Sequence, residues 1–166
     1  TFPGRTAHAR RRPSSGPSGS SDGAAELRAN AGRVVGWADM RQRSDSLAVA
    51  TRRGLTEITS AVRAVVRASG ITEGLCTVFI RHTSASLVIQ ENADPSVRRD
   101  LEAFLSRLVP DGDALFTHVD EGDDDMPAHV KAALLKTSEQ VPVVGGELAL
   151  GTWQGLFVWE HRSGSH

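Results

Sequence analysis

The sequence predicts an α+β fold, in the form of a single compact domain with a mainly antiparallel sheet and about three helices. From about Trp37 onward, short segments of alternating, β-branched or aromatic residues recur at regular spacing and outnumber the helical patterns. Several of these segments are paired across glycine-containing turns, which is typical of hairpins. Because hairpins place neighbouring strands antiparallel, helices packed beside such a sheet give an α+β domain.

The N-terminal segment, residues 1–38, is expected to be a disordered leader, and residues 39–166 are expected to form the domain. The leader is rich in Arg, Ser, Gly and Pro and offers almost nothing to bury. Residues 1–21 contain four arginines and no acidic residue, so a net charge of −1 for the whole chain leaves −5 for the remainder. A transit peptide or a nucleic-acid-binding arm would also be basic, but the segment lacks an amphipathic pattern and the domain has no matching basic run.

The first elements of the domain follow from alternation and from helix signals. Ser46–Thr51 alternates and predicts a strand, which Leu55–Ile58 extends or pairs with. Thr59 is a suitable N-cap for a helix that runs to Ser69 and ends at Gly70, since glycine readily adopts the left-handed conformation. One face of this helix carries three apolar side chains, Val62, Val65 and Val66.

Two strands and a well-marked helix come next. Leu75–Arg81 is β-branched and aromatic enough for a buried strand, and Ala85–Gln90 predicts another. Asp94 is placed to cap the following helix, with Pro95 in its first turn. The apolar stripe of this helix consists of Val97, Leu101, Phe104, Leu105 and Leu108.

The last part of the chain predicts one more helix and three strands. Phe116–Val119 is a short extended approach to an acidic loop, and the helix is expected over roughly Pro127–Lys136. The strands are expected near Gln140–Val144, Glu147–Leu150 and Leu156–His161. Gly145-Gly146 and the segment Gly151–Gly155 supply the turns between them.

The segment His118–His129 concentrates metal-binding and proton-transferring groups just before the last helical pattern. It holds two imidazoles and five carboxylates, those of Asp120, Glu121, Asp123, Asp124 and Asp125. Pro127 suits the first turn of a helix, which places Asp124 and Asp125 at the helix start and His129 one turn inside. Free N–H groups and the helix dipole favour anions at that end, so the two carboxylates can be held charged and directed at a common point. A divalent cation is the expected occupant of that point. A solvated acidic loop that only caps the helix is the alternative.

Four other segments carry side chains capable of chemistry. Residues 81–86 place an imidazole beside three hydroxyls, as in a proton relay or an oxyanion contact, although such hydroxyls also bond to backbone. Residues 151–155 present an indole ring and an amide that can bind a heteroaromatic ligand, unless the ring only covers the edge of the core. At the end of the last strand, alternation turns Glu160 and Arg162 one way and His161 the other. Glu91, just before the Asp94 cap, has no evident structural role.

Composition excludes several classes of protein. No apolar run reaches 18 residues, so no membrane-spanning helix is expected. Cys76 is the only cysteine, which excludes an internal disulfide and a thiolate zinc site and fits a cytoplasmic location. No G-x-S-x-G elbow supports a serine hydrolase. Imidazole with carboxylate suits Zn²⁺, Mn²⁺ or Fe²⁺, whereas an all-oxygen subset of the acidic loop suits Mg²⁺.

Three long motifs occur in the order HTSASLVIQENADPSVRRDL, THVDEGDDDMPAH and GTWQGLFVWEHR. In this order and spacing they closely resemble the YjbQ-like family, described as secondary thiamine-phosphate synthase enzymes. The resemblance covers about Asp45 to Arg162 and leaves the leader outside. Departures are small: Gln90 replaces a common asparagine, Phe116 a common tyrosine, and residues 138–140 a more apolar strand start.

The resemblance implies a compact α+β domain that assembles as a homotrimer, with metal and substrate sites near subunit contacts. It also implies a transferase that joins hydroxymethylpyrimidine diphosphate to hydroxyethylthiazole phosphate and releases pyrophosphate. The word "secondary" marks this activity as ancillary, so a trimeric metal- or ligand-binding protein with incidental synthase activity is an alternative, as is a metal-assisted phosphohydrolase. A small phosphorylated heterocycle is the expected partner, and neither a membrane nor a nucleic acid is expected.

The same resemblance divides the site residues by role. A divalent cation, Zn²⁺ or Mg²⁺, would be bound by His118, His129 and an aspartate, with Asp124 and Asp125 as the candidates. Its charge would offset that of the leaving diphosphate. The candidate phosphate contacts are Thr83, Ser84 and Arg162, and the candidate ring contacts are Trp153 and Gln154. His82, Glu91 and His161 are the candidate catalytic acid–base or further metal-binding groups.

Overall fold

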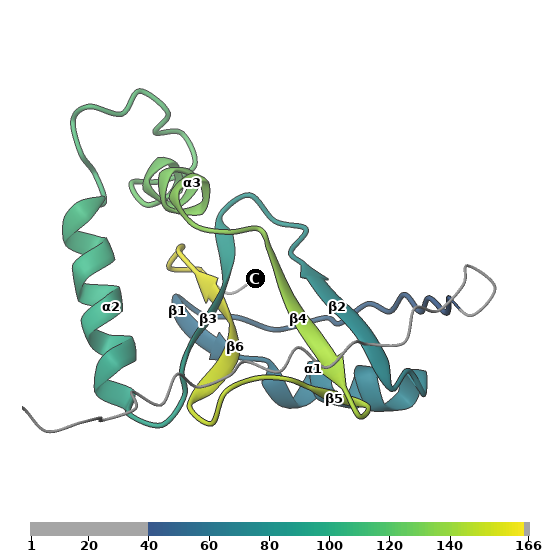
Figure 1. Ribbon diagram of the computed structural model, residues 1–166. Coiled ribbons are helices and arrows are strands. Elements are labelled where there is room, and N and C mark those ends of the chain that lie inside the picture. Colours follow the sequence, from purple (N-terminus) through teal and green to yellow (C-terminus); the bar gives the residue numbers. More distant parts are fainter. Residues whose placement is uncertain (1–39, 165–166) are drawn as a thin grey trace, which may run out of the picture. The chain divides into compact units, whose positions relative to one another are not determined.

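The computed structural model describes residues 40–164, in which six strands form two three-stranded antiparallel sheets beside three helices. The first sheet contains β1 (Gly54–Glu57), β6 (Gln154–Glu160) and β3 (Ala85–Glu91), in this order (Figure 1). The second contains β2 (Glu73–Phe79), β4 (Ser138–Val144) and β5 (Glu147–Leu148). The expected α+β class is confirmed, with the antiparallel strands divided between two sheets rather than one. The expectation for residues 1–38 lies outside the described residues.

The two sheets meet beside the start of β4. A backbone hydrogen bond links them there: the Leu87 N–H of β3 donates to the Lys136 carbonyl at 2.7 Å. The Ile80 N–H donates to the Thr137 carbonyl at 2.9 Å and continues the pairing of β2 with β4. β6 lies between β1 and β3, and β4 lies between β2 and β5. Strand β3 therefore pairs fully with β6 and also contacts the other sheet.

The hydrophobic core is built from both sheets and from α1 (Thr59–Ser69). Its buried members are Ile58, Val62, Val66, Ala85, Leu87, Val141, Val143, Leu148, Leu156 and Val158. Val62 and Val66 come from the predicted valine face of α1, and this helix ends at Gly70 with φ of 67°. Burial of each large aliphatic side chain contributes about 1.5–3 kcal/mol, so this cluster supplies much of the driving force for folding.

Two expectations at the start of the domain are wrong. No strand covers Ser46–Thr51, because the two sides of β6 are occupied by β1 and β3. Alternation shows which side chains could share a face, but a strand also needs a neighbour for its backbone groups. Thr59 does not cap α1. It is the first helical residue, and its hydroxyl accepts from the Leu156 N–H at 2.9 Å and donates to Glu57 at 2.8 Å.

Two apolar patterns lie on the surface rather than in the core. Leu75 and Phe79 of β2 are exposed, so the expectation of a buried strand is wrong. α2 (Pro95–Leu108) begins as predicted, with the Asp94 carboxylate accepting from the Ser96 N–H at 2.7 Å. Of its apolar stripe, however, only Leu105 is buried, whereas Phe104 is 58% exposed. A repeated pattern reveals an apolar face, but not what covers that face.

The third helix, α3 (Asp125–Leu134), packs against β3 and begins at the acidic loop. It starts and ends two residues earlier than expected, at Asp125 rather than Pro127 and at Leu134 rather than Lys136. Pro127 still lies in its first turn, where its missing N–H costs nothing. None of the helices in the described part of the chain is long and apolar enough to cross a bilayer.

Candidate metal centre

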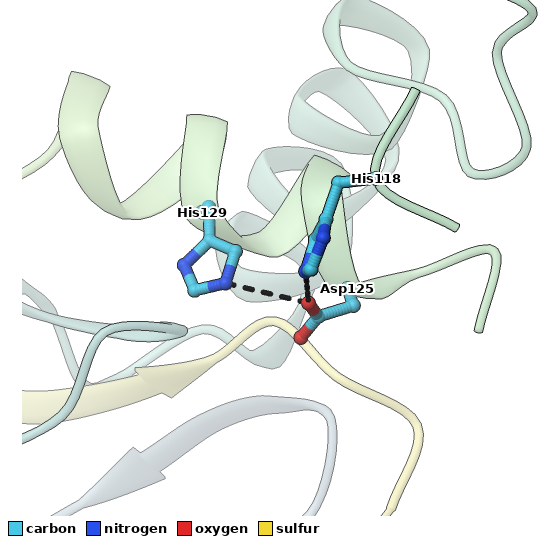
Figure 2. Close-up of side chains that lie close together, drawn as sticks. All are labelled: His118, Asp125 and His129. Atoms are coloured by element: carbon cyan, nitrogen blue, oxygen red, sulfur yellow. Dashed lines mark hydrogen bonds and ion pairs between the residues drawn. The ribbon is translucent and has the colours of Figure 1, made fainter. Parts of the chain in front are cut away.

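His118, Asp125 and His129 converge at the N-terminus of α3. Asp125 and His129 are four residues apart on this helix, which places them on one face, and His118 reaches them from the preceding loop. Figure 2 shows both imidazoles directed at the same carboxylate. The Asp125 Oδ2 atom lies 2.9 Å from His118 Nε2 and 3.3 Å from His129 Nε2. One ligand atom from each of the three residues lies within 4.8 Å of the others.

The hydrogen bonds around His129 fix which of its ring nitrogens carries the proton. Its Nδ1 atom lies 3.1 Å from the Thr83 carbonyl oxygen, which can only accept, so Nδ1 must donate. In the neutral ring, the Nε2 atom then carries a lone pair that faces a carboxylate oxygen of Asp125. A divalent cation bound between these two atoms would accept both lone pairs. The carbonyl contact also fixes the ring orientation, as is common for metal-binding histidines.

The second oxygen of Asp125 is held by Arg162. Arg162 Nη1 lies 2.9 Å from Asp125 Oδ1, and the Asp125 side chain is only 3% exposed. The same guanidinium donates to the Glu121 carbonyl at 2.6 Å and has Nε 3.6 Å from Asp124 Oδ1. Arg162 therefore fixes the carboxylate of Asp125 so that Oδ2 faces the imidazoles. These contacts all join the guanidinium to the acidic loop and the start of α3, so it is not free.

Asp124 does not join this cluster. Its Oδ2 atom accepts from the backbone N–H and the hydroxyl of Ser163, both at 2.7 Å. These bonds hold the pKa of Asp124 below its usual range, with the Arg162 charge adding to the effect. The sequence did not distinguish these two aspartates. The structure brings Asp125 to the imidazoles, whereas Asp124 bonds to Ser163 in the C-terminal segment. A hollow of about 490 Å³ adjoins Asp124, Arg162 and Ser163.

The donor set fits a divalent cation of the zinc type. Two imidazole nitrogens and one carboxylate oxygen suit Zn²⁺, Mn²⁺ or Fe²⁺ better than Mg²⁺, which prefers oxygen ligands. Three protein ligands leave at least one coordination position for water or substrate, as in catalytic rather than structural zinc sites. The side chains of His118 and His129 are 45% and 36% exposed, so this position opens toward solvent.

A second set of charges lies near this centre and was missed from the sequence. Lys131, on α3, is buried, and burial lowers its pKa. Its Nζ atom lies 3.4 Å from Asp111 Oδ1, and both oxygens of Asp111 also pair with the Arg53 guanidinium. Asp111 sits in a Pro-Asp-Gly segment that resembles an ordinary turn, and the helix pattern gave no sign that Lys131 points inward. Only the tertiary fold brings these three residues together.

His161 lies deeper, with its Nε2 atom 2.9 Å from the Ser86 hydroxyl. Both residues are buried, and His161 is separate from the His118–Asp125–His129 cluster. Burial lowers the pKa of His161 to about 4, and the charges of Lys131 and Arg53 add to the shift. The ring is therefore neutral at neutral pH, which suits a hydrogen-bonding role beside Ser86.

This shift makes folding stability depend on pH. The unfolded chain binds a proton at His161 below about pH 6.5, whereas the folded chain does so only near pH 4. The contribution of His161 to the free energy of unfolding is therefore complete above about pH 6.5, its pKa in the unfolded chain, and is lost as the pH falls toward 4. We expect wild type to lose about 2 kcal/mol more unfolding free energy than His161→Gln between pH 8 and pH 5. Urea unfolding at both pH values measures this difference, with His82→Gln as an exposed control; equal pH slopes for wild type and His161→Gln would contradict it.

The other predicted residues divide between the two ends of the first sheet. Thr83 lies beside His129, and Ser84 is buried, with its N–H 3.2 Å from the Nδ1 atom of the exposed His82. Ala85, at the start of β3, is opposite Glu160, whereas Glu91, at its end, is opposite Gln154. The length of a seven-residue strand, roughly 20 Å, therefore separates the metal centre from Glu91, Trp153 and Gln154.

The far end holds Glu91, Trp153 and Gln154. Trp153 is exposed, and its carbonyl accepts from the Asn92 N–H at 3.0 Å. The amide oxygen of Gln154 accepts from the Gly151 N–H at 2.8 Å, which closes its own turn. Within one chain, these three residues do not share a site with His118, Asp125 and His129.

The chain is similar to proteins from bacteria and archaea. The family described as "UPF0047 protein YjbQ-like" matches residues 45–165. A UPF0047 protein of Synechocystis is 55% identical over 130 residues, covering 78% of this chain and 88% of that protein. The crystal structure of an uncharacterized YjbQ/UPF0047 protein from Clostridium acetobutylicum is 35% identical, with a TM-score of 0.63, and covers 71% of this chain and 92% of that one. A Sulfolobus solfataricus structure, described as a YbjQ-like protein of unknown function, is 29% identical with a TM-score of 0.60, covering 69% and 86%.

Proposed function

The chain belongs to the YjbQ-like UPF0047 family, and from the geometry of its His118–Asp125–His129 cluster we propose that it is a metal-dependent transferase. The substrate class is a diphosphorylated heterocycle, and the reaction is that of a thiamine-phosphate synthase. It joins hydroxymethylpyrimidine diphosphate to hydroxyethylthiazole phosphate and releases pyrophosphate. The observation that carries the proposal is the convergence of two imidazoles and one buried carboxylate at a solvent-accessible helix N-terminus.

In this proposal the protein holds a Zn²⁺-type ion through His118 Nε2, His129 Nε2 and Asp125 Oδ2. The bound ion supplies positive charge next to the leaving diphosphate. Arg162 and the Thr83 carbonyl act as positioning groups, because one fixes the carboxylate and the other fixes an imidazole. The exposed side chains of His82 and Thr83 lie in the loop that touches His129, where they can contact a substrate phosphate.

A homotrimer is part of the same proposal. Glu91, Trp153 and Gln154 lie at the end of the sheet far from the metal centre, so they could line the same site only from a neighbouring subunit. Exposed apolar side chains on two elements, Leu75 and Phe79 on β2 and Phe104 and Leu108 on α2, offer surfaces for such contacts. Light scattering coupled to size exclusion measures the mass of the assembly directly.

A metal-assisted phosphohydrolase is the second candidate, and the open coordination position favours it. A site with three protein ligands can also activate a water molecule, which would release inorganic phosphate from a phosphorylated substrate. A protein that only binds metal or ligand would show neither reaction. A transferase would therefore release pyrophosphate, a phosphohydrolase would release inorganic phosphate, and a binding protein would form no product.

The test is a product assay on the purified full-length protein, supplied with Zn²⁺ or Mg²⁺ and both substrates. We expect thiamine phosphate and pyrophosphate in equal amounts, and we expect Asp125→Asn to lose most of this activity. Asp120→Asn is the matched control, since it removes the same charge from an exposed position in the same loop. Inorganic phosphate without thiamine phosphate would instead identify a hydrolase, and metal binding without turnover would identify a binding protein. Complementation of a synthase-deficient strain at native expression would show whether the rate is useful in a cell.

A further inference from the structure

A cavity of about 200 Å³ lies between the start of β1, α2, α3 and the end of β6. Its charged and polar lining consists of Arg53, Glu102, Ser106, Lys131, Glu160 and His161. None of the three residues of the candidate metal centre lines it. Lys131 and His129 are two residues apart on α3, so their side chains do not share a face of the helix. The cavity is therefore a separate feature of the fold.

Lys131 brings an incompletely bonded ammonium group to this cavity. Its side chain is 3% exposed, and among the described residues its single hydrogen-bond acceptor is Asp111 Oδ1, at 3.4 Å. A bond between an ammonium and a carboxylate is normally 2.7–2.9 Å long. The ammonium has three N–H donors, so at least two of them lack an acceptor in this part of the chain. A buried charge in this condition is costly unless something else bonds to it.

The nearby carboxylates are already occupied by other donors. Both oxygens of Asp111 pair with Arg53, at 2.5 and 3.1 Å. Glu160 accepts from the backbone N–H groups of His161 and Arg162, both at 3.0 Å, and from the Thr51 hydroxyl at 3.2 Å. One oxygen of Glu102 accepts from the Leu55 N–H at 3.1 Å. None of these bonds comes from Lys131, whose ammonium therefore has only its 3.4 Å contact with Asp111 among residues 40–164.

Two more groups of the lining can bond to an occupant. The Ser106 hydroxyl is exposed on α2, with no hydrogen-bond partner among residues 40–164. His161 uses Nε2 for Ser86, and its Nδ1 atom has no partner in the same range. An occupant that accepts several hydrogen bonds through closely spaced oxygens satisfies these groups and the ammonium together.

We propose that this cavity binds a phosphate group, held chiefly by Lys131 and independently of the metal centre. A tetrahedral oxyanion offers several acceptor oxygens at once, and a volume of about 200 Å³ holds one with room for water, whose share of liquid volume is about 30 Å³. Lysine is a common point-charge ligand for phosphate. The phosphate can be inorganic or part of a small phosphorylated ligand, because the lining recognises the shared oxyanion.

The experiment is a calorimetric titration of the full-length protein with inorganic phosphate. We expect saturable binding to wild type and a loss of affinity of roughly 10- to 100-fold in Lys131→Met, which keeps the aliphatic stem but removes the charge. Lys136→Met is the matched control, because it removes a lysine that is exposed. The double variant His118→Ala/His129→Ala should bind phosphate like wild type, so a failure of the proposed metal centre leaves this result intact.

A second variant guards against misfolding of Lys131→Met. Ser106→Glu adds a negative charge at an exposed position on the cavity wall, and it should weaken phosphate binding while Ser106→Gln, of similar size, does so much less. Equal phosphate affinity in wild type, Lys131→Met and Ser106→Glu would overturn the proposal. So would an absence of saturable binding to wild type, or a loss of binding in the double histidine variant, because that loss would place the phosphate at the metal centre.

Discussion

Replacing His118 or His129 by alanine is expected to remove most of the bound divalent metal while the domain stays folded. Each imidazole supplies a nitrogen that faces Asp125 Oδ2, and two remaining ligands do not make a tight site. The fold should survive because both histidines lie outside the hydrophobic core. Elemental analysis and calorimetric titration of the purified variants measure the loss, and circular dichroism checks the fold. Wild-type metal content in both variants would reject the centre and leave Asp125 as a partner of Arg162 alone.

The two neighbouring aspartates sharpen this test. Asp125→Asn should weaken metal binding by more than about 100-fold, because it alters a ligand that also pairs with Arg162. Asp124→Asn should have a smaller effect, since this carboxylate bonds to Ser163 and lies outside the cluster. Arg162→Gln should fall in between, at roughly 10- to 100-fold, as is typical of groups that orient a ligand. Equal effects of Asp124→Asn and Asp125→Asn would show that net charge, rather than coordination, controls binding.

Leu87→Ala is expected to destabilise the domain by about 2–5 kcal/mol. Leu87 is 2% exposed, belongs to the core cluster and lies on β3 where the two sheets are linked. Truncation removes apolar contacts from both sheets and leaves a cavity that a doubly anchored strand cannot readily collapse. The free energy of unfolding from urea titrations gives the cost.

The matched control for this change is Leu134→Ala, at the last residue of α3. The chemical change is identical, but Leu134 is 60% exposed, so the expected cost is within about 0.5 kcal/mol. Similar costs for the two substitutions would show that Leu87 is not the core residue described here, or that Leu134 is covered in the assembled protein. The oligomeric mass of each variant separates these two explanations.

Local chemistry in the sequence predicted the parts of the fold that depend on neighbouring residues. Asp94 and Pro95 mark the start of α2, and Gly145 and Gly146, both at positive φ, form the turn between β4 and β5. The acidic loop also predicted correctly that Asp125 and His129 lie near a helix N-terminus, because Pro127 restricts where that helix can begin.

The remaining features depend on contacts between distant segments. Ser46–Thr51 alternates like a strand, yet β1 rather than this segment pairs with β6. No local pattern distinguishes Asp124 from Asp125, because the distinction comes from Ser163 and Arg162 at the other end of the domain. Lys131 looks like a solvent-facing helix residue until Asp111 and Arg53 are seen beside it.

The position of β6 at the centre of its sheet has a consequence for folding kinetics. Both β1 and β3 hydrogen-bond to β6 alone within the first sheet, and the buried contact between Thr51 and Glu160 spans 109 positions of the chain. Such long-range closure loses much chain entropy before any pairing energy is gained, which makes folding slow relative to a helical domain of similar size. Until β6 docks, the edges of β1 and β3 are open to other chains, so refolding yield should fall as protein concentration rises.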